Sequence, residues 1–254
     1  MNTNPLISII TVVFNGAATI EQTIQSVLHQ TYRNIEYIII DGGSTDGTLK
    51  IIKKYEKKIA FWKSEPDKGL YDAMNKGIAI ASGELIGMIN SDDWYEPNAV
   101  DLVVNAFISY PEKRIFHGDM YVVNKTNDKR LYKHNPSTFK FKYYGATFNH
   151  PTFFVTQQEY KEHHYNKDLK SQADIQFTME AFLKDKSKFF YINSAISNFR
   201  LDGKSGNMKR IDSLKEGFVA RKKAGMSHLE NILSVCIRCI YWIICDVMFL
   251  TKKK

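Results

Sequence analysis

Cysteine is scarce in this chain of 254 residues: the three cysteines, Cys236, Cys239 and Cys245, all lie in the last 20 residues. This distribution excludes a disulfide-stapled fold and fits a reducing compartment. Cys236 and Cys239 lack the second ligand pair of a structural zinc site. The chain has no uninterrupted run of 18 apolar residues and no basic residue before its first apolar run, so we expect no signal peptide.

A large excess of one charge is also missing from most of the chain. The 35 basic and 27 acidic residues give a net charge of +8, but residues 204–254 hold 11 basic and 4 acidic residues, which is +7. Residues 1–203 are therefore close to neutral, which argues against nucleic acid as a partner of the main body. A negatively charged surface is a better partner for the C-terminal segment.

What the chain does have is an alternation of apolar strands and amphipathic helices over its first 110 residues. Continuous β-branched runs at 6–14, 35–40 and 84–89 are typical of strands buried on both faces, and helical patterns separate them. This order predicts an α/β fold with βαβ units around a parallel sheet.

The second half is less regular. We expect strands at 114–123 and 129–133 forming a hairpin, a strand at 152–155, a helix with Ile175 and Met179 on its apolar side, a strand at 188–192, a loop at 198–206, and helices at 208–224 and 229–250.

Polar residues follow three of the predicted strands. Asn15 ends the first, Asp41 ends the second, and the 84–89 strand runs into Asn90-Ser91-Asp92-Asp93. Ligands of open α/β sheets bind beyond the carboxyl ends of the strands, and carboxylate and amide oxygens suit Mg²⁺ or Mn²⁺ with substrate phosphates. The pattern predicts a metal–diphosphate site, although each segment taken alone also fits a turn or a helix cap.

Five ordered blocks of residues together resemble family 2 glycosyltransferases. They are 11–15 (TVVFN), 26–31 (SVLHQT), 41–48 (DGGSTDGT), 64–77 (SEPDKGLYDAMNKG), and 81–84 leading to 90–93 (NSDD). The resemblance implies a GT-A fold, a Rossmann-like and mostly parallel sheet flanked by helices, with a C-terminal helical extension. It implies a glycosyltransferase domain over 1–225, with a nucleotide-binding half at about 1–123 and an acceptor half at about 124–225, followed by a helix in 226–254.

The same resemblance implies roles for individual residues on the donor side. Asp41 would hydrogen-bond the nucleotide base, Asp92 would contact ribose or sugar, and Asp93 would hold a divalent metal with Asp92 beside it. The family often has an aspartate at the place of Asn90, so Asp92 and Asp93 remain as the acidic pair. The other expected donor-side residues are Thr11, Phe14, Asn15, Asp67, Lys68, Gly69, Asn75, and Arg200 or Lys204 near the diphosphate.

Inverting transfer also needs a base that accepts the proton of the acceptor hydroxyl. Asp174, at the start of the helix with Ile175 and Met179, is the candidate, because the family commonly carries its base at such a helix start. An N-terminal cap is the structural alternative for Asp174. Asp119 is the reserve candidate, and His150 is expected on the acceptor side.

The segment 229–250 is nearly all apolar, with polar positions Asn231, Ser234, Arg238, Cys245 and Asp246 at helical steps. Arg238 and Asp246 each disfavour a membrane crossing by roughly 2.5–3.5 kcal/mol. We expect a helix lying in the cytoplasmic leaflet, and a helix docked on the core or in a dimer seam is the alternative.

The sequence thus predicts an inverting enzyme, dependent on Mg²⁺ or Mn²⁺, at the cytoplasmic face of the inner membrane. It would move a hexose or N-acetylhexosamine from a UDP-sugar to a lipid-linked glycan of a surface polysaccharide such as O-antigen, capsule or exopolysaccharide. A nucleotidyltransferase and a non-catalytic nucleotide-sugar-binding scaffold are the alternatives. A dinucleotide-binding dehydrogenase is disfavoured because no Gly-x-Gly-x-x-Gly follows the first strand.

Overall fold

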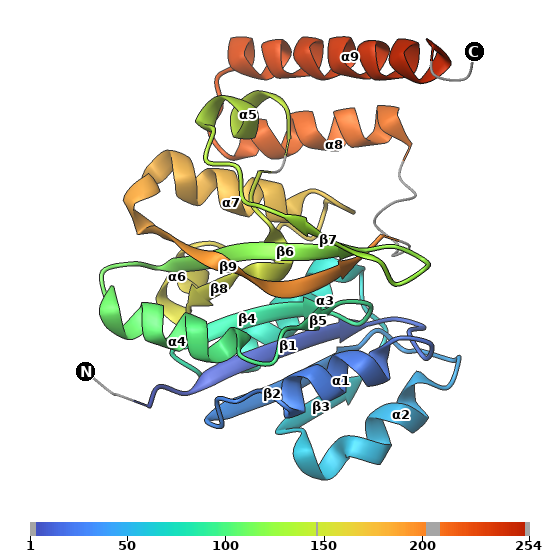
Figure 1. Cartoon of the computed structure of the whole chain (residues 1–254), viewed down its shortest axis with the longest axis vertical. Helices are drawn as coiled ribbons and strands as arrows, with labels where there is room; N and C mark the ends of the chain where they lie inside the picture. Colours follow the sequence, from blue (N-terminus) through green and yellow to red (C-terminus); the bar gives the residue numbers. More distant parts are fainter. Residues whose placement is uncertain (1–3, 146, 202–208, 252–254) are drawn as a thin grey trace.

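A computed structural model of the chain describes residues 4–145, 147–201 and 209–251. Its sheet runs in the order β3-β2-β1-β4-β8-β6-β9-β5, and β7 pairs with the later part of β6, beyond the residues that pair with β8 (Figure 1). This mixed α/β architecture, with helices on both faces of one sheet, confirms the predicted fold class.

The first four strands of the sheet are parallel and are joined by helices, as the apolar runs predict. β1 pairs with β2 and with β4, and β2 pairs with β3. The elements are β1 (Ile7–Val13), α1 (Ile20–Leu28), β2 (Ile35–Asp41), α2 (Thr48–Tyr55), a 3-10 turn (Glu56–Lys58), β3 (Phe61–Ser64), α3 (Leu70–Ile80) and β4 (Leu85–Asn90).

The second half adds strands of both directions to this sheet. Its elements are β5 (Trp94–Tyr95), α4 (Ala99–Ser109), β6 (Ile115–Val123), β7 (Lys129–Tyr132), α5 (Thr138–Tyr143), a 3-10 turn (His150–Thr152), β8 (Phe154–Thr156), α6 (Gln157–Glu162), α7 (Ala173–Lys184), a 3-10 turn (Lys186–Lys188), β9 (Phe189–Arg200), α8 (Arg210–Lys223) and α9 (His228–Thr251). β8 is antiparallel to both β4 and β6, and β9 is parallel to β6.

Two expectations for this half are wrong in detail. The strand predicted at 188–192 continues to Arg200, so the predicted loop at 198–206 does not begin at 198. β9 is extended because β6 pairs with it as far as Val123 opposite Arg200, and β5 pairs on its other side. The rest of that predicted loop, with Lys204, lies outside the described residues apart from Leu201.

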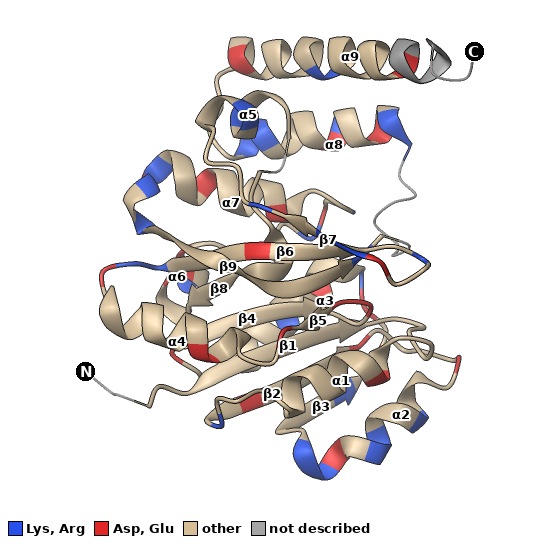
Figure 2. Cartoon of the chain, viewed as in Figure 1, with Lys and Arg blue, Asp and Glu red and all other residues tan. Residues whose placement is uncertain are grey.

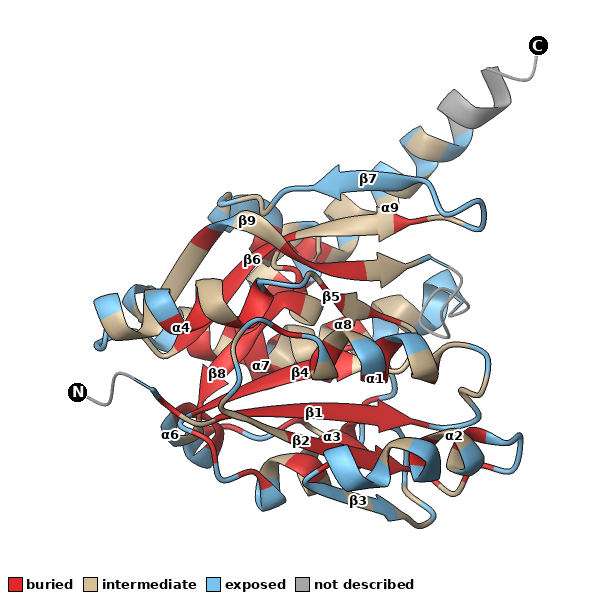
Figure 3. Ribbon diagram, turned by 60° about the horizontal axis from the view of Figure 1, so that its bottom comes forward, coloured by how far each residue is buried: buried red, intermediate tan, exposed pale blue. Residues whose placement is uncertain are grey.

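The core lies on both faces of the sheet. On one face, α1, α2 and α4 pack against Ile7 and Ile9 of β1, and on the other face α3, α6 and α7 pack near Ile10 and Val12. Figure 3 shows β1, β2 and β4 buried, whereas the edge strands β3 and β7 are largely exposed. Helices α8 and α9 with α5 form further layers beyond α7 (Figure 1).

Candidate active site

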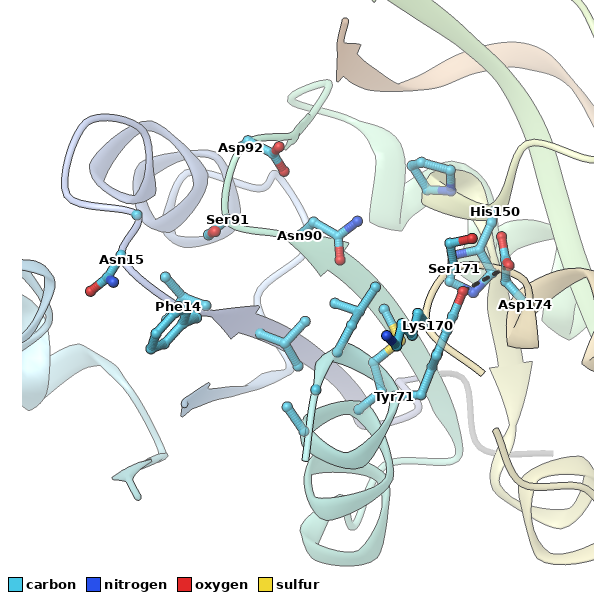
Figure 4. A pocket seen from close by; sticks show the side chains of 18 of the residues that line it. Phe14, Asn15, Tyr71, Asn90, Ser91, Asp92, His150, Lys170, Ser171 and Asp174 are labelled. Atoms are coloured by element: carbon cyan, nitrogen blue, oxygen red, sulfur yellow. Dashed lines mark hydrogen bonds between the residues drawn. The ribbon is translucent and has the colours of Figure 1, made fainter. Parts of the chain in front are cut away.

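A cavity of about 1000 Å³ opens at the carboxyl ends of β1 and β4. One side is formed by the end of β1, the start of α3 and the end of β4, and the other by residues around α7 and the start of α8 (Figure 4). Eight of the predicted site residues line it, namely Phe14, Asn15, Asp67, Gly69, Asp92, His150, Asp174 and, at the end of β9, Arg200.

The loop after β1 presents Phe14 and Asn15 to this cavity. Phe14 is 51% exposed although it follows a buried strand. Asn15 has a φ of 51°, its N–H donates to Ser44 Oγ at 2.7 Å, and its Oδ1 accepts from the N–H of Thr45 at 2.9 Å. Asn tolerates this left-handed backbone better than most residues. The β1 and β2 loops are therefore joined through Asn15.

Asp41 organises the β2 loop from inside the protein. Its carboxylate is fully buried, and Oδ2 accepts from the N–H groups of Gly43 and Ser44, at 3.0 and 2.9 Å, and from Ser64 Oγ at 2.6 Å. Asp41 is not one of the described residues that line the cavity. These donors hold the carboxylate within the β2 loop, and the expectation that Asp41 hydrogen-bonds the nucleotide base stays a prediction.

Thr11 is not among the described residues that line the cavity. Its side chain is fully buried within β1, where Thr11 Oγ1 and Tyr37 Oη are 3.1 Å apart. Its expected role in the donor pocket stays a prediction. Phe14 and Asn15, beyond the end of the strand, are on the wall instead.

The segment before α3 contributes backbone and carboxylate groups. Asp67 and Gly69 line the cavity, and Asp67 Oδ1 accepts from the N–H of Gly69 at 2.8 Å. Gly69 has a φ of 114°, a conformation that favours glycine. Lys68 and Asn75 are not among the described lining residues. Asn75 instead bonds both the N–H and the C=O of Tyr165, which ties α3 to the segment before α7.

The adjacent carboxylates at the end of β4 lie in different environments. Asp92 lines the cavity, whereas Asp93 is 1% exposed, lies outside the described lining, and accepts from the N–H of Arg200 at Oδ1 (2.9 Å). Burial and the neighbouring Asp92 raise the pKa of Asp93 well above its ordinary value. Asp93 Oδ1 is thus bonded to the β9 backbone, whereas Asp93 Oδ2 is buried without a hydrogen-bond partner in the described part of the chain, so the expectation that Asp93 holds the metal stays a prediction.

Arg200 closes one side of the cavity. Its guanidinium donates to the C=O of Asp92 at 3.3 Å and to Gln22 Oε1 at 2.8 Å, and lies 5.1 Å from the centre of the Trp94 ring. These contacts hold a cation beside the Asp92 segment, where it can meet a diphosphate.

Asp174 stands on the opposite side of the cavity, in the first turn of α7 (Figure 4). Its Oδ1 accepts a hydrogen bond from Tyr71 Oη at 2.9 Å. Tyr71 also stacks on Tyr165, whose hydroxyl lies 2.7 Å from Nε2 of His150. Burial lowers the pKa of His150, against the opposing effect of Asp174. The carboxylate is thus held at the wall by a buried aromatic network.

Asp119, the reserve base, does not lie at the described cavity wall. It is buried in β6, and its Oδ1 accepts from the N–H of His134 and from Tyr191 Oη, both at 2.8 Å. These bonds connect β6 with the segment after β7 and with β9. In this structure Asp119 therefore holds the hairpin against β9.

Lys170, Ser171, Lys209 and Asp212 line the cavity but are absent from the sequence-based site. Lys170 and Ser171 directly precede the Gln172-Ala173-Asp174 segment. Their closeness to Asp174 in the sequence is the signal that could have identified them as site residues. Lys209 and Asp212 carried no local signal, because the approach of α8 to the cavity is a tertiary feature.

The oxygen atoms at the end of β4 fit a hard divalent cation. Asp92 lines the cavity, and within the described part of the chain the buried Oδ1 of Asn90 and Oδ2 of Asp93 have no hydrogen-bond partner. No group of three or more His, Cys, Asp or Glu side chains suited to a metal occurs among the described residues. The protein would supply one or two oxygen ligands, and substrate phosphates would complete the shell, as is common for Mg²⁺.

One known protein family matches more than half of this chain. A model described as "Glycosyl transferase family 2" matches residues 8–165. The chain belongs to this family. The resemblance inferred from the five sequence blocks is thereby confirmed.

Named relatives agree with this assignment. The family 2 chain is 44% identical over 108 residues to an uncharacterized glycosyltransferase of Mycobacterium tuberculosis, covering 42% of this chain and 41% of that protein. It is 27% identical to the chondroitin synthase of Escherichia coli, covering 89% of this chain and 33% of that protein. The chain therefore spans less than half the length of these relatives.

Solved structures share the fold. S. aureus TarS 1–349 in complex with UDP-GlcNAc superposes with a TM-score of 0.71 at 18% identity, covering 92% of this chain and 71% of that one. The mannosyltransferase PcManGT of Pyrobaculum calidifontis, in complex with GDP-Man and Mn²⁺, has a TM-score of 0.65 at 14% identity, covering 96% and 76%. These similarities establish a GT-A type fold.

Proposed function

We propose that this chain transfers a sugar from a nucleotide-sugar donor to a glycan acceptor, with inversion at the anomeric carbon. The observation that carries the proposal is one cavity with Asp92 and Arg200 on one side and Asp174 on the other. Membership of glycosyl transferase family 2 supports the reaction class.

The donor would occupy the side of the cavity formed by β1, α3 and β4. Phe14 offers an exposed ring for the nucleotide base, and Asn15, Asp67 and Gly69 offer polar groups for the base and ribose. Asp92, with Asp93 or the amide oxygen of Asn90, would hold Mg²⁺ or Mn²⁺, and Arg200 would meet the diphosphate. A bound divalent cation would offset the negative charge that develops on the departing diphosphate.

Asp174 would act as the general base. It accepts the proton of the acceptor hydroxyl while that oxygen bonds to the anomeric carbon, and the bond from that carbon to the diphosphate breaks on the opposite face. The hydrogen bond from Tyr71 holds one carboxylate oxygen of Asp174 in place, which leaves Oδ2 for the acceptor. His150, fixed by Tyr165, would border the acceptor.

UDP-hexose or UDP-N-acetylhexosamine is the proposed donor, because TarS is a structural neighbour with UDP-GlcNAc bound. A growing surface polysaccharide is the proposed acceptor, because relatives include the chondroitin and hyaluronan synthases. We extend the proposal to a lipid-linked acceptor met at the cytoplasmic face of the inner membrane.

The decisive experiment measures nucleoside diphosphate release from a panel of UDP- and GDP-sugars, with Mn²⁺, Mg²⁺ or a chelator, followed by mass analysis of a lipid-linked acceptor. We expect one donor to be consumed, with kcat lowered by about 10²–10⁴ in Asp174→Asn, since general base catalysis contributes that factor. Asp128→Asn, in the exposed β6–β7 hairpin, is the matched control. Donor binding without turnover in the wild type would instead support the scaffold alternative, and wild-type kcat in Asp174→Asn would remove the base assignment.

A further inference from the structure

Helix α9 is oriented opposite to an ordinary surface helix, because its polar side chains face the protein. Asn231 and Ser234 are each 1% exposed. Asn231 Nδ2 donates to the C=O of Phe218 in α8 at 2.7 Å, and Ser234 Oγ donates to the C=O of Tyr143 in α5 at 3.1 Å. Arg238 donates to Ser213 Oγ of α8 at 3.3 Å. The helix is therefore docked through hydrogen bonds.

The opposite side of α9 is apolar and faces outward. Its large side chains are 43–79% exposed and recur at helical spacing along one side, namely Leu229, Ile232, Leu233, Ile240, Ile243 and Ile244. A surface helix normally turns such a stripe toward the core. A contiguous exposed apolar patch of this kind marks an interaction site.

The segment that carries this face has an excess of basic residues. The two acidic residues of α9 are both paired, Glu230 with Lys142 at 2.6 Å and Asp246 with Arg210 at 2.7 Å. The supporting helix α8 has exposed Lys215, Lys222 and Lys223 besides the acidic Asp212 and Glu216. Figure 2 shows α9 as mostly uncharged above the basic segments of α5 and α8. The segment 204–254 as a whole carries +7.

We propose that the outer face of α9 lies flat in the headgroup region of an anionic phospholipid bilayer. Its apolar side chains enter the acyl boundary, its polar stripe stays on α8 and α5, and the surrounding lysines meet lipid phosphates. The 19 residues His228–Asp246 are long and apolar enough to cross a membrane. A crossing would, however, strip Asn231, Ser234 and Arg238 of their partners in α5 and α8, so we assign the in-plane orientation.

This orientation gives the lipid-linked acceptor a route. α8 supports α9 and also contributes Asp212, in its first turn, to the cavity wall, next to Lys209. An acceptor whose lipid tail stays in the bilayer would therefore approach the cavity beside α8. The inference rests on the peripheral location proposed above and names the surface responsible for it.

The test is flotation of the full chain with vesicles of phosphatidylcholine alone or with 30% phosphatidylglycerol, without any sugar substrate. We expect binding to the anionic vesicles, and at least a tenfold lower partition coefficient for Ile240→Gln/Ile243→Gln. The matched control is Ile80→Gln/Leu183→Gln, which changes side chains that are 38% and 37% exposed in α3 and α7. The control should partition like the wild type.

Three outcomes would overturn the inference. Equal vesicle binding by the α9 variant and the wild type would exclude this face. Resistance of the bound wild type to extraction at pH 11 would indicate a crossing helix. A wild-type dimer in solution that the α9 variant dissociates, without vesicle binding, would assign the face to a second copy. Donor turnover is measured separately on the same variants, so a failure here leaves the glycosyl transfer proposal standing.

Discussion

Neighbouring residues with the same chemistry serve different purposes in this protein. Asp92 and Asp93 are adjacent, yet one borders the cavity and the other is buried against the N–H of Arg200. Both lie in the turn that follows β4, which brings Asp92 to the cavity wall and buries Asp93. Phe14, beyond the end of β1, likewise lies at the wall, whereas Thr11 is buried inside the sheet.

Tyr71 is predicted to position Asp174. Tyr71→Phe removes the only O–H that the tyrosine can donate to Asp174 Oδ1. A hydrogen bond to a charged group contributes about 1.5–3 kcal/mol, so we expect kcat to fall by roughly 10- to 100-fold with donor KM little changed. Steady-state kinetics with Tyr55→Phe as the control test this. An equal loss in both variants would contradict a specific role.

His117 is predicted to make the fold acid-sensitive. It is buried among aromatic rings, including Phe148 at 4.9 Å, and burial lowers its pKa to about 3. The unfolded chain, with an ordinary pKa near 6.5, binds a proton that the folded chain excludes. Stability is therefore complete above pH 6.5 and is lost as the pH falls toward 3, by about 1.4 kcal/mol per pH unit in that window.

Urea unfolding at several pH values measures this effect. His117→Phe should flatten the loss of unfolding free energy between about pH 6 and pH 4, while His164→Phe, at an exposed position, should keep it. A wild-type slope in His117→Phe would rule out His117 as the source.

At the scale of elements, α9 is attached by polar contacts where a globular protein ordinarily uses apolar ones. Besides the Asn231 and Ser234 bonds, the attachment includes Glu230, which accepts from Lys142 and from Ser227. These contacts lower the pKa of Glu230 to about 2. Docking of α9 should therefore depend on ionised Glu230.

The sign of this pH dependence follows from the lowered pKa. The Lys142 interaction stabilises the docked helix above about pH 4.5 and is lost as the pH falls toward 2. Glu230→Gln should increase proteolytic cleavage at the 224–228 connection at pH 7, to the level of the wild type in acid. Glu112→Gln, an exposed carboxylate on another connection, is the control, and identical cleavage of Glu230→Gln and wild type would contradict the role.

At the scale of the whole molecule, the cavity joins loops that are far apart in the chain. Its lining comes from the ends of β1, β4 and β9 and from the first turns of α3, α7 and α8. A ligand that bridges these segments stabilises the folded state by mass action.

We expect UDP with Mn²⁺, each about 100-fold above its Kd, to add about 2.7 kcal/mol to the unfolding free energy. For a chain of this size that raises Tm by roughly 5–10 °C, measurable by thermal denaturation. Asp92→Asn should lose the Mn²⁺-dependent part of the shift, and Asp128→Asn should retain it. A full shift in Asp92→Asn would show that its carboxylate does not hold the metal.

The sequence by itself determined the parallel βαβ half and the loops after β1 and β4 that border the cavity, and its five ordered blocks carried the resemblance to family 2. The βαβ half and these loops depend on local periodicity and on turn residues, which act over a few positions. Only the tertiary structure decided that Asp92 and not Asp93 faces the cavity, that β9 continues to Arg200, and that α9 turns its apolar side outward. These outcomes depend on strand pairing and helix packing between residues that can be more than a hundred positions apart, such as Asp93 and Arg200, and no local pattern encodes them.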